Sequence, residues 1–205
     1  PQRELDALPH PPGSGPRTAL VLDQPAARQL ALLRLALPGH KHIALISSPV
    51  SAGQAAAVAH TASAFGLSAT TTVIDDEKAL YPALSSALDE STILLSLPDS
   101  RVYNARTIAN VLLTAFRLRA PVLGFSAAYV RAGAMLGLYA TPSQVGTEGA
   151  NLARRLLAGE PAPAPDTHAL FEVEINRTVA RALGLVLPET EALTRDLRRH
   201  ERGQP

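Results

Sequence analysis

The sequence predicts an α/β protein in which parallel sheets are flanked by helices. Short apolar runs alternate with stretches of helical spacing along almost the whole chain, and the connections between them are short. The run at 91–99 has an almost unbroken apolar middle, which is typical of a strand covered on both faces. With 46% hydrophobic and 18% charged residues, the 205-residue chain has the composition of a folded protein.

The expected strands are the short apolar or alternating segments between turn signals. The segment 170–177 alternates between apolar and polar residues, as a half-buried strand does. They lie at 18–23, 41–48, 68–75, 91–99, 121–126 and 170–177, with a further apolar stretch at 134–140.

The expected helices have apolar residues three or four positions apart. The clearest covers 104–119, where a stripe runs from Ile108 to Ala115, and Thr141 followed by Pro142 is a good helix opening. The helices are expected at 24–39, 51–66, 77–90, 104–119, 127–133, 141–159, 178–185 and 189–200. Residues 1–17 are rich in Pro and Gly and indicate an irregular lead-in.

Composition excludes several classes of function. Lys plus Arg is 19 and Asp plus Glu is 18, so the chain has no basic excess of the kind that sequence-independent nucleic-acid binders carry. We therefore expect no nucleic-acid partner. The chain has no Cys, which excludes disulfides, thiolate metal sites and Cys nucleophiles. No apolar run reaches the length of about 18 residues that a transmembrane helix needs.

The sequence contains no catalytic signature. The glycine-rich phosphate loops GxGxxG and GxxxxGK[ST] and the nucleophile elbow GxSxG are all missing, so we expect no enzyme and no cofactor. His40 and His42 alternate at a strand entry without a carboxylate at useful spacing, which favours surface histidines over a metal site. The cluster Asp75–Glu77 is either a cation or general-base site or, as we favour, the acidic opening of a helix.

In doubly wound folds, ligands bind beyond the carboxyl ends of the strands. That rule selects four loops: Ser47–Ser51, Asp75–Glu77, Pro98–Asn104 and Ser126–Tyr129.

Asp99 is the most informative residue in these loops. It directly follows a buried strand, and a carboxylate there needs a donor or a cation to offset its desolvation. Asp99 either receives a ligand ammonium group or caps the following turn. Tyr103 and Asn104 in the same segment are also candidates for ligand binding, although Asn104 is more readily explained as a helix N-cap.

Two further loops supply hydroxyl groups. Ser48 and Ser51 lie where a strand ends and a helix begins, so they either hold a ligand carboxylate together with free N–H groups or simply cap the helix. Ser126 and Tyr129 follow another strand, and Tyr129 is either a stacking wall of the site or a core residue. These residues complete our candidate ligand site, which contains no metal.

Four blocks of the sequence are notable for their order and spacing: LDQPAARQLALLRLALPG, LLSLPDSRVYNARTIANVLL, PVLGFSAAYVRAGAMLGLYATPSQVG and FEVEINRTVARALGLVLP. Together they resemble one family, the ABC-transporter substrate-binding proteins whose better-known branch contains lipoproteins for tryptophan and tyrosine. The resemblance covers about residues 18–190.

The resemblance implies a two-lobed periplasmic-binding-protein fold with a ligand in the cleft between the lobes. Asp99 occupies the position of the family's strand-end Asp. Where members often carry Glu-Ala-Asn-Ser, this chain has the segment 49–52, PVSA, which retains only a hydroxyl group at Ser51. Near Ser126 the acidic residue usual in the aromatic-amino-acid branch is missing, which argues against an aromatic amino acid as ligand.

Members of the family normally carry several further βα units before the strand at 18–23. We therefore expect an incomplete first lobe, either cut or naturally shortened. The expected division is a lead-in at 1–17, the second lobe with a crossing strand at 18–98, and the C-terminal half of the first lobe with a crossover and a terminal helix at 99–205. Asp99 lies at this boundary and is grouped with Ser48 and Ser51, and Ser126 and Tyr129 would close on the ligand from the opposite lobe.

An incomplete lobe predicts an exposed apolar surface. We expect it on helix 104–119 and strand 121–126, where the missing units would pack, and with it self-association or completion of the fold by another chain.

The function implied by the resemblance is that of a non-enzymatic, extracytoplasmic or periplasmic solute-binding component of an ABC importer. It would bind a small polar ligand, with an amino acid as one candidate, and signal to a membrane permease. The alternative is a sensory or accessory binding protein of the same fold without a dedicated transporter. The sequence does not identify the ligand.

Overall fold

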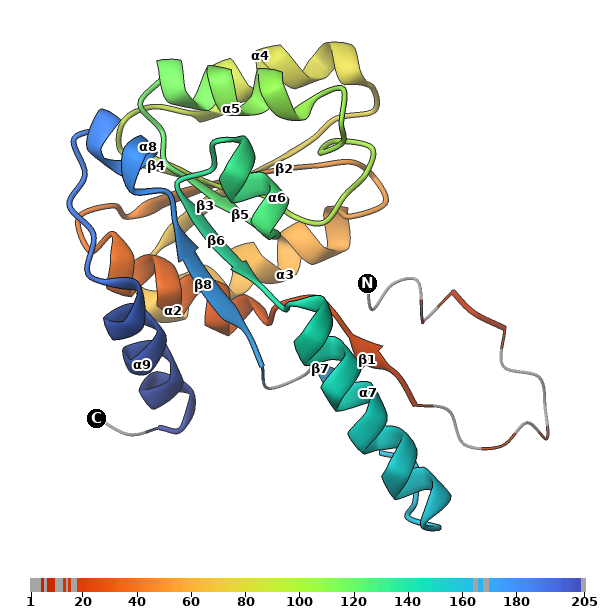
Figure 1. Ribbon diagram of the computed structural model, residues 1–205. Helices are drawn as coiled ribbons and strands as arrows, with labels where there is room; N and C mark the ends of the chain where they lie inside the picture. The colour runs from red at the N-terminus through yellow and green to blue at the C-terminus, as the bar shows by residue number, and fades with distance from the viewer. Residues whose placement is uncertain are drawn as a thin grey trace.

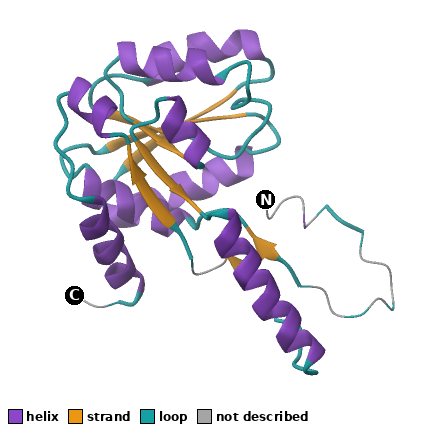
Figure 2. Cartoon of the chain, in the orientation of Figure 1, coloured by secondary structure: helices purple, strands orange, loops and turns teal. Residues whose placement is uncertain are grey.

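The computed structural model of this chain describes residues 5, 7–9, 13, 15, 18–163, 166–167 and 170–203. Within this part the strands form a six-stranded sheet and a separate two-stranded pair, and helices cover both faces of the larger sheet (Figures 1 and 2). The α/β class with a mostly parallel sheet is therefore confirmed. Most of the predicted lead-in, 1–17, lies outside the described residues.

The six-stranded sheet has the order β3-β2-β4-β5-β6-β8. All neighbours pair in parallel except β6 and β8, which are antiparallel. The strands of this sheet are β2 (His42–Ser47), β3 (Ser68–Val73), β4 (Thr92–Leu95), β5 (Val122–Gly124), β6 (Leu136–Tyr139) and β8 (Glu172–Ile175). The separate pair consists of β1 (Leu20–Val21) and β7 (Asp166–Thr167).

The helices follow the predicted order with small shifts at their ends. The segment predicted as one helix over 77–90 begins with a 3₁₀ turn, and α5 begins only at Ile108 because turns occupy the residues before it. No described helix is long and apolar enough to cross a membrane. The helices are α2 (Ala26–Ala36), α3 (Ala52–Ala62), η1 (Ser63–Phe65), η2 (Glu77–Ala79), α4 (Leu80–Ala87), α5 (Ile108–Arg117), α6 (Ala127–Ala132), α7 (Pro142–Leu157), α8 (Arg177–Ala182) and α9 (Thr190–Glu201).

The sheet separates two apolar cores. Along β2, Ile43 and Leu45 point into the core under α2, α3 and α9, whereas Ala44 and Ile46 point into the core under α4 and α5. Because successive side chains of a strand point to opposite faces, a strand buried on both faces needs an unbroken apolar run. This explains the continuous runs from which the central strands were predicted.

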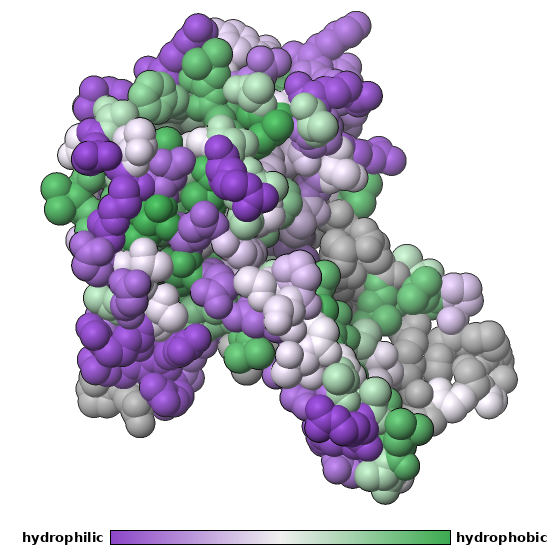
Figure 3. Space-filling view, in the orientation of Figure 1, coloured by the Kyte–Doolittle hydropathy of each residue, from purple (hydrophilic) through white to green (hydrophobic). Residues whose placement is uncertain are grey.

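A small arm stands apart from the sheet. It consists of β1, β7 and α7, which runs beside β1 (Figure 1). The helix opens with a capping box in which Thr141 and Gln144 exchange side-chain and backbone hydrogen bonds. No residue of α7 is buried, and Leu157 is 88% exposed. Figure 3 shows hydrophobic residues at the free end of this arm.

The predicted division of the chain at residue 98/99 is wrong. Strand β4 pairs with β2 on one side and with β5 on the other, so Leu94 lies beside both Ala44 and Val122. Strands on the two sides of the predicted boundary thus belong to one continuous sheet. What stands apart is the arm, whose strands come from distant parts of the chain.

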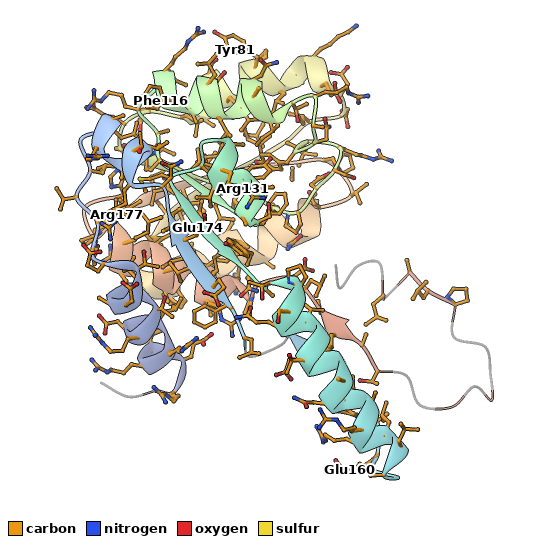
Figure 4. The ribbon with its side chains drawn as sticks, viewed as in Figure 1. Tyr81, Phe116, Arg131, Glu160, Glu174 and Arg177 are labelled. Carbon is orange, nitrogen blue, oxygen red and sulfur yellow. The ribbon has the colours of Figure 1, made fainter. Side chains whose placement is uncertain are left out.

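The prediction of an exposed apolar surface on α5 and β5 is also wrong. Strand β5 is paired along both edges, and α5 packs its apolar stripe into the core. The large apolar side chains left exposed on this side are scattered over the outer helices, including Tyr81 on α4 and Phe116 on α5 (Figure 4). Isolated exposed side chains of this kind are normal on soluble proteins.

Two glycines let α6 approach the sheet closely. Gly124 and Gly137 are partners in the register of β5 and β6. A Cβ atom at Gly124 would lie 2.7 Å from Cβ of Tyr129, and one at Gly137 would collide with Val130. The absence of side chains at these two positions therefore sets where Tyr129 lies.

We predict that Gly124→Ala destabilises the protein by about 1–3 kcal/mol, because the added methyl group overpacks the contact between β5 and α6. The measurement is chemical denaturation followed by circular dichroism. Gly53→Ala is the matched control, since Gly53 lies on the exposed side of α3 and an added Cβ there meets nothing within 4 Å. Equal stability of the two variants would show that the close approach is not rigid.

Candidate functional site

The predicted site residues gather at the carboxyl edge of the six-stranded sheet. They follow three strands that are neighbours in the sheet, β2, β4 and β5. The seven residues are Ser48, Ser51, Asp99, Tyr103, Asn104, Ser126 and Tyr129.

Asp99 ties two of these loops together. Its side chain is almost fully buried at 1% exposure. One carboxylate oxygen, Oδ2, accepts hydrogen bonds from the Ser48 backbone N–H at 2.9 Å and from the Ser51 hydroxyl. The other, Oδ1, accepts from the Arg101 N–H at 2.9 Å. The carboxylate thus joins the loop after β2 to the loop after β4.

These donors decide the charge state of Asp99. Burial raises the pKa of the carboxyl group, but the hydrogen bonds from Ser51, Ser48 and Arg101 together outweigh it and hold the pKa below its ordinary value of 3.8. Asp99 is therefore a carboxylate at neutral pH, stabilised by donors of its own chain.

The geometry assigns structural roles to residues for which the sequence left two explanations open. Ser51 stands at the N-terminus of α3, yet its hydroxyl makes no capping bond to the helix and instead donates to Asp99. Asp99 holds the turn that follows it, since its own carbonyl oxygen accepts from Tyr103 N at 2.7 Å. Direct contact between Asp99 and a ligand remains a prediction.

Three aromatic rings pack beside this tie. Tyr129 lies 4.7 Å from Phe125 and 6.2 Å from Tyr103 between ring centroids. The Tyr103 hydroxyl donates to the Ile46 carbonyl oxygen at 3.1 Å, which fixes the loop after β4 to the end of β2. Burial raises the pKa of the Tyr103 phenol far above its ordinary value.

The Tyr129 hydroxyl is buried without a partner. Within the described part of the chain its oxygen has no hydrogen bond, and the same holds for the Ser47 hydroxyl at the end of β2. Burial raises the pKa of Tyr129, and the neighbouring Tyr103 adds to the effect. An unpaired buried hydroxyl costs free energy, so each such group calls for an explanation.

Ser126 and Asn104 act as caps. Ser126 Oγ accepts from the Tyr129 N–H at 3.3 Å at the start of α6. Asn104 Oδ1 accepts from the Arg106 N–H at 2.9 Å, so it caps the turn before α5, whose N-cap is Thr107. The prediction that Ser126 and Tyr129 face Asp99 from an opposite lobe is wrong, because both residues follow β5, which belongs to the same sheet as β2 and β4.

The acidic cluster after β3 opens a helical turn, as we favoured. Asp76 Oδ1 accepts from the N–H groups of Lys78 and Ala79, and Glu77 pairs with Arg106 at 2.5 Å. His42 bonds to Ser68 and Thr70 on the neighbouring strand. Among the described residues, no three His, Asp or Glu side chains are grouped so that they could hold a metal ion.

A buried polar cluster lies where the chain enters the sheet domain, and the sequence analysis did not predict it. The Arg28 guanidinium lies 4.6 Å from the Phe171 ring centre, pairs with Glu201 and donates to Gln24 Oε1 at 2.8 Å. These residues come from the connection after β1, from α2, from the segment before β8 and from α9. Only the i, i+4 spacing of Gln24 and Arg28 could have suggested a contact.

Open pockets of about 410 to 550 Å³ lie elsewhere on the molecule. One is at the opposite end of the sheet beside Arg119, one runs along α9, and one lies on the solvent side of α7. None of these three is lined by a predicted site residue. Hydrogen bonds and ring packing organise the carboxyl edge, where the predicted site residues lie.

Comparison with known proteins gives the class. The family model for ABC transporter substrate binding proteins matches residues 18–195, so the chain belongs to this family. No curated protein sequence matches it.

Solved structures show the same fold. A conserved domain protein from Vibrio cholerae O1 biovar El Tor superposes with a TM-score of 0.69 at 22% identity, covering 87% of this chain and 60% of that one. An ABC domain from Streptococcus pneumoniae in complex with L-Trp gives 0.66 at 20% identity, covering 87% and 62%. CD0873 from Clostridium difficile, described as a ligand-free, open substrate-binding protein, gives 0.68 at 21% identity, covering 85% and 60%.

The chain thus spans about three fifths of the length of these relatives. The expected periplasmic-binding-protein-like fold is confirmed, with a mostly parallel sheet flanked by helices.

We predict that Asp99→Asn lowers the free energy of unfolding at pH 7 by about 1–3 kcal/mol, because an amide cannot accept from all three donors. The pKa of Asp99 is depressed in the folded state, so its contribution is present above the ordinary pKa and is lost as pH falls through the folded pKa. The difference between wild type and variant should therefore shrink in acid.

Denaturant titrations at neutral and acidic pH measure this difference. Asp76→Asn serves as the control, because it keeps the oxygen that caps an exposed turn and should change stability by less than about 0.5 kcal/mol. If Asp99→Asn were as stable as wild type at pH 7, the carboxylate would not be what holds the two loops together.

Proposed function

We propose that this chain is a non-enzymatic, extracytoplasmic solute-binding component of an ABC importer, which holds a small polar solute at the carboxyl edge of its sheet. Membership of the substrate-binding family supports the general role. In open α/β sheets ligands bind beyond the carboxyl ends of the strands. Every predicted site residue lies at that edge.

The proposal rests on one observation: a buried hydroxyl group without a hydrogen-bond partner among the described residues lies beside loops that hydrogen bonds hold in place. Asp99, Ser51 and Ser48 hold two loops in place. The ring of Tyr129 packs against Tyr103 of one of these loops, and its buried hydroxyl has no partner in the described structure. A polar solute that donates to or accepts from this hydroxyl would offset its desolvation.

The solute we propose is small and polar, with an amino acid as one candidate. The Streptococcus pneumoniae relative holds L-Trp. In this chain Asp99 Oδ1 accepts from the Arg101 N–H, and because a carboxylate oxygen can accept two hydrogen bonds, an ammonium group could also bind there. The segment 49–52, PVSA, and the absence of an acidic residue beside Ser126 argue against a large aromatic ligand.

The second wall of the site would come from the other lobe. The arm of β1, β7 and α7 is the described part of this chain outside the sheet domain, and we propose that it belongs to that lobe. A membrane permease would then recognise the state in which the two lobes have closed on the solute. Completion of this lobe by another copy of the chain, as the sequence suggested, also remains a proposal. No observation favours the sensory alternative.

We predict that Tyr129→Phe separates binding from stability. Removal of an unpaired buried hydroxyl should leave the melting temperature unchanged or raise it, whereas affinity for the solute should fall about tenfold, equivalent to about 1.4 kcal/mol. Calorimetric titration and thermal melts measure the two effects. Tyr81→Phe on the exposed face of α4 is the control. Unchanged affinity of Tyr129→Phe would remove this hydroxyl from the site.

The solute itself is found by native mass spectrometry of the purified protein, followed by thermal-shift assays with L-amino acids and other small polar solutes, L-Trp included. We expect at least one small polar solute to raise the melting temperature and to titrate to saturation. A protein that carries no solute and responds to none would contradict a solute-binding role for this chain.

A further inference from the structure

Strand β3 forms an open edge of the six-stranded sheet. It stands at one end of the strand order and pairs, within the described residues, with β2 alone. All six of its residues are in register with β2, from Ser68 beside His42 to Val73 beside Ser47. The strand is therefore regular along its whole length, and its outer side presents free backbone groups.

The inner bonds show which backbone groups face outward. Ser68 N–H donates to Lys41 O and Ile74 N–H donates to Ser47 O, both at 2.8 Å. In a parallel pair the N–H and C=O groups of alternate residues point to the same neighbour. Even-numbered residues of β3 therefore face β2, and Ala69, Thr71 and Val73 direct their N–H and C=O groups to the open side.

This edge has none of the usual protection against pairing. Natural edge strands are commonly blunted by charged side chains, Pro or a short length. The sequence of β3, SATTTV, contains neither a charge nor Pro and is rich in β-branched residues. Four of its six residues are exposed, with Val73 at 51%.

We propose that β3 pairs antiparallel with β3 of a second copy of this chain, which joins two sheets into one across a twofold axis. The outward groups at alternate residues allow a register with Thr71 opposite Thr71 on the axis and Ala69 opposite Val73 on either side. All three outward residues then exchange both hydrogen bonds with the partner. An edge that matches itself in this way is what a twofold interface requires.

Charge favours this register as well. The acidic residues 75–77 follow β3 directly, and like charges opposite one another would destabilise the pair. In the proposed register Asp75 lies opposite Leu67 and Glu77 lies opposite Phe65, so no acidic residue faces another. This interface lies on the sheet edge and does not use the arm.

The test uses single-cysteine variants, since the chain contains no Cys. Directly opposite residues of a hydrogen-bonded antiparallel pair have Cα atoms about 5.5 Å apart, which suits a disulfide. Thr71→Cys should therefore cross-link under oxidised glutathione, and the dimer is seen on a non-reducing gel. In the control Val73→Cys, the two cysteines lie four residues apart along the strands, about 13 Å, which is too far to bridge.

We expect Thr71→Cys to cross-link at least about tenfold faster than Val73→Cys, and a mixture of Ala69→Cys with Val73→Cys to form the mixed dimer. Thr71→Pro should weaken the dimer of the otherwise unmodified chain at least tenfold in sedimentation velocity. It removes an outward N–H without touching the bonds to β2, and edge strands tolerate Pro in that orientation.

Several results would overturn the proposal. The wild-type chain could stay monomeric at millimolar concentration. Cysteines at positions 71 and 73 could cross-link at equal rates, or Thr71→Pro could leave the stability of the dimer unchanged. Faster cross-linking through Leu157→Cys at the end of the arm would place self-association on the incomplete lobe instead. Cross-linking of Thr71→Cys only to other proteins would indicate strand addition by a different partner.

Discussion

The carboxylate of Asp99 is the interaction on which the candidate site depends. Parallel strands end at a common edge, but the loops that follow them have no hydrogen-bond ladder of their own. In this chain one buried charge accepts from Ser48, Ser51 and Arg101, and so fixes the loops after β2 and β4 to each other. The Tyr103 hydroxyl also bonds to the Ile46 carbonyl oxygen, and the Tyr103 ring packs on Tyr129. These contacts connect the same loops to α6.

The two interior glycines position one part of this edge, and the Arg28 cluster connects other segments of the chain. Gly124 and Gly137 let α6 lie directly on the sheet, which brings Tyr129 against Tyr103. Arg28, packed against Phe171 and paired with Glu201, holds together segments where the chain passes between the arm and the sheet domain. A binding protein that closes on its solute needs a rigid site within each lobe and defined connections between the lobes.

Much of the fold could be predicted from local pattern, whereas the pairing of elements could not. Runs such as 41–48 and 91–99 gave the strands because both faces of the sheet are covered. The boundary at 98/99 failed because the apolar run of β4 does not reveal that it pairs with both β2 and β5. Asp99 could be found from its place after a buried strand. Its partner Ser51 lies 48 residues away, so its role as a donor rather than a cap was visible only in three dimensions.

The central claim is that the solute binds at the carboxyl edge organised by Asp99. Hydrogen–deuterium exchange with and without the co-purified solute tests it most directly. We expect solute-dependent protection in segments 47–51, 98–104 and 125–130, with little change at the opposite end of the sheet around Arg119. Protection confined to the Arg119 pocket, or spread evenly over the chain, would contradict the account.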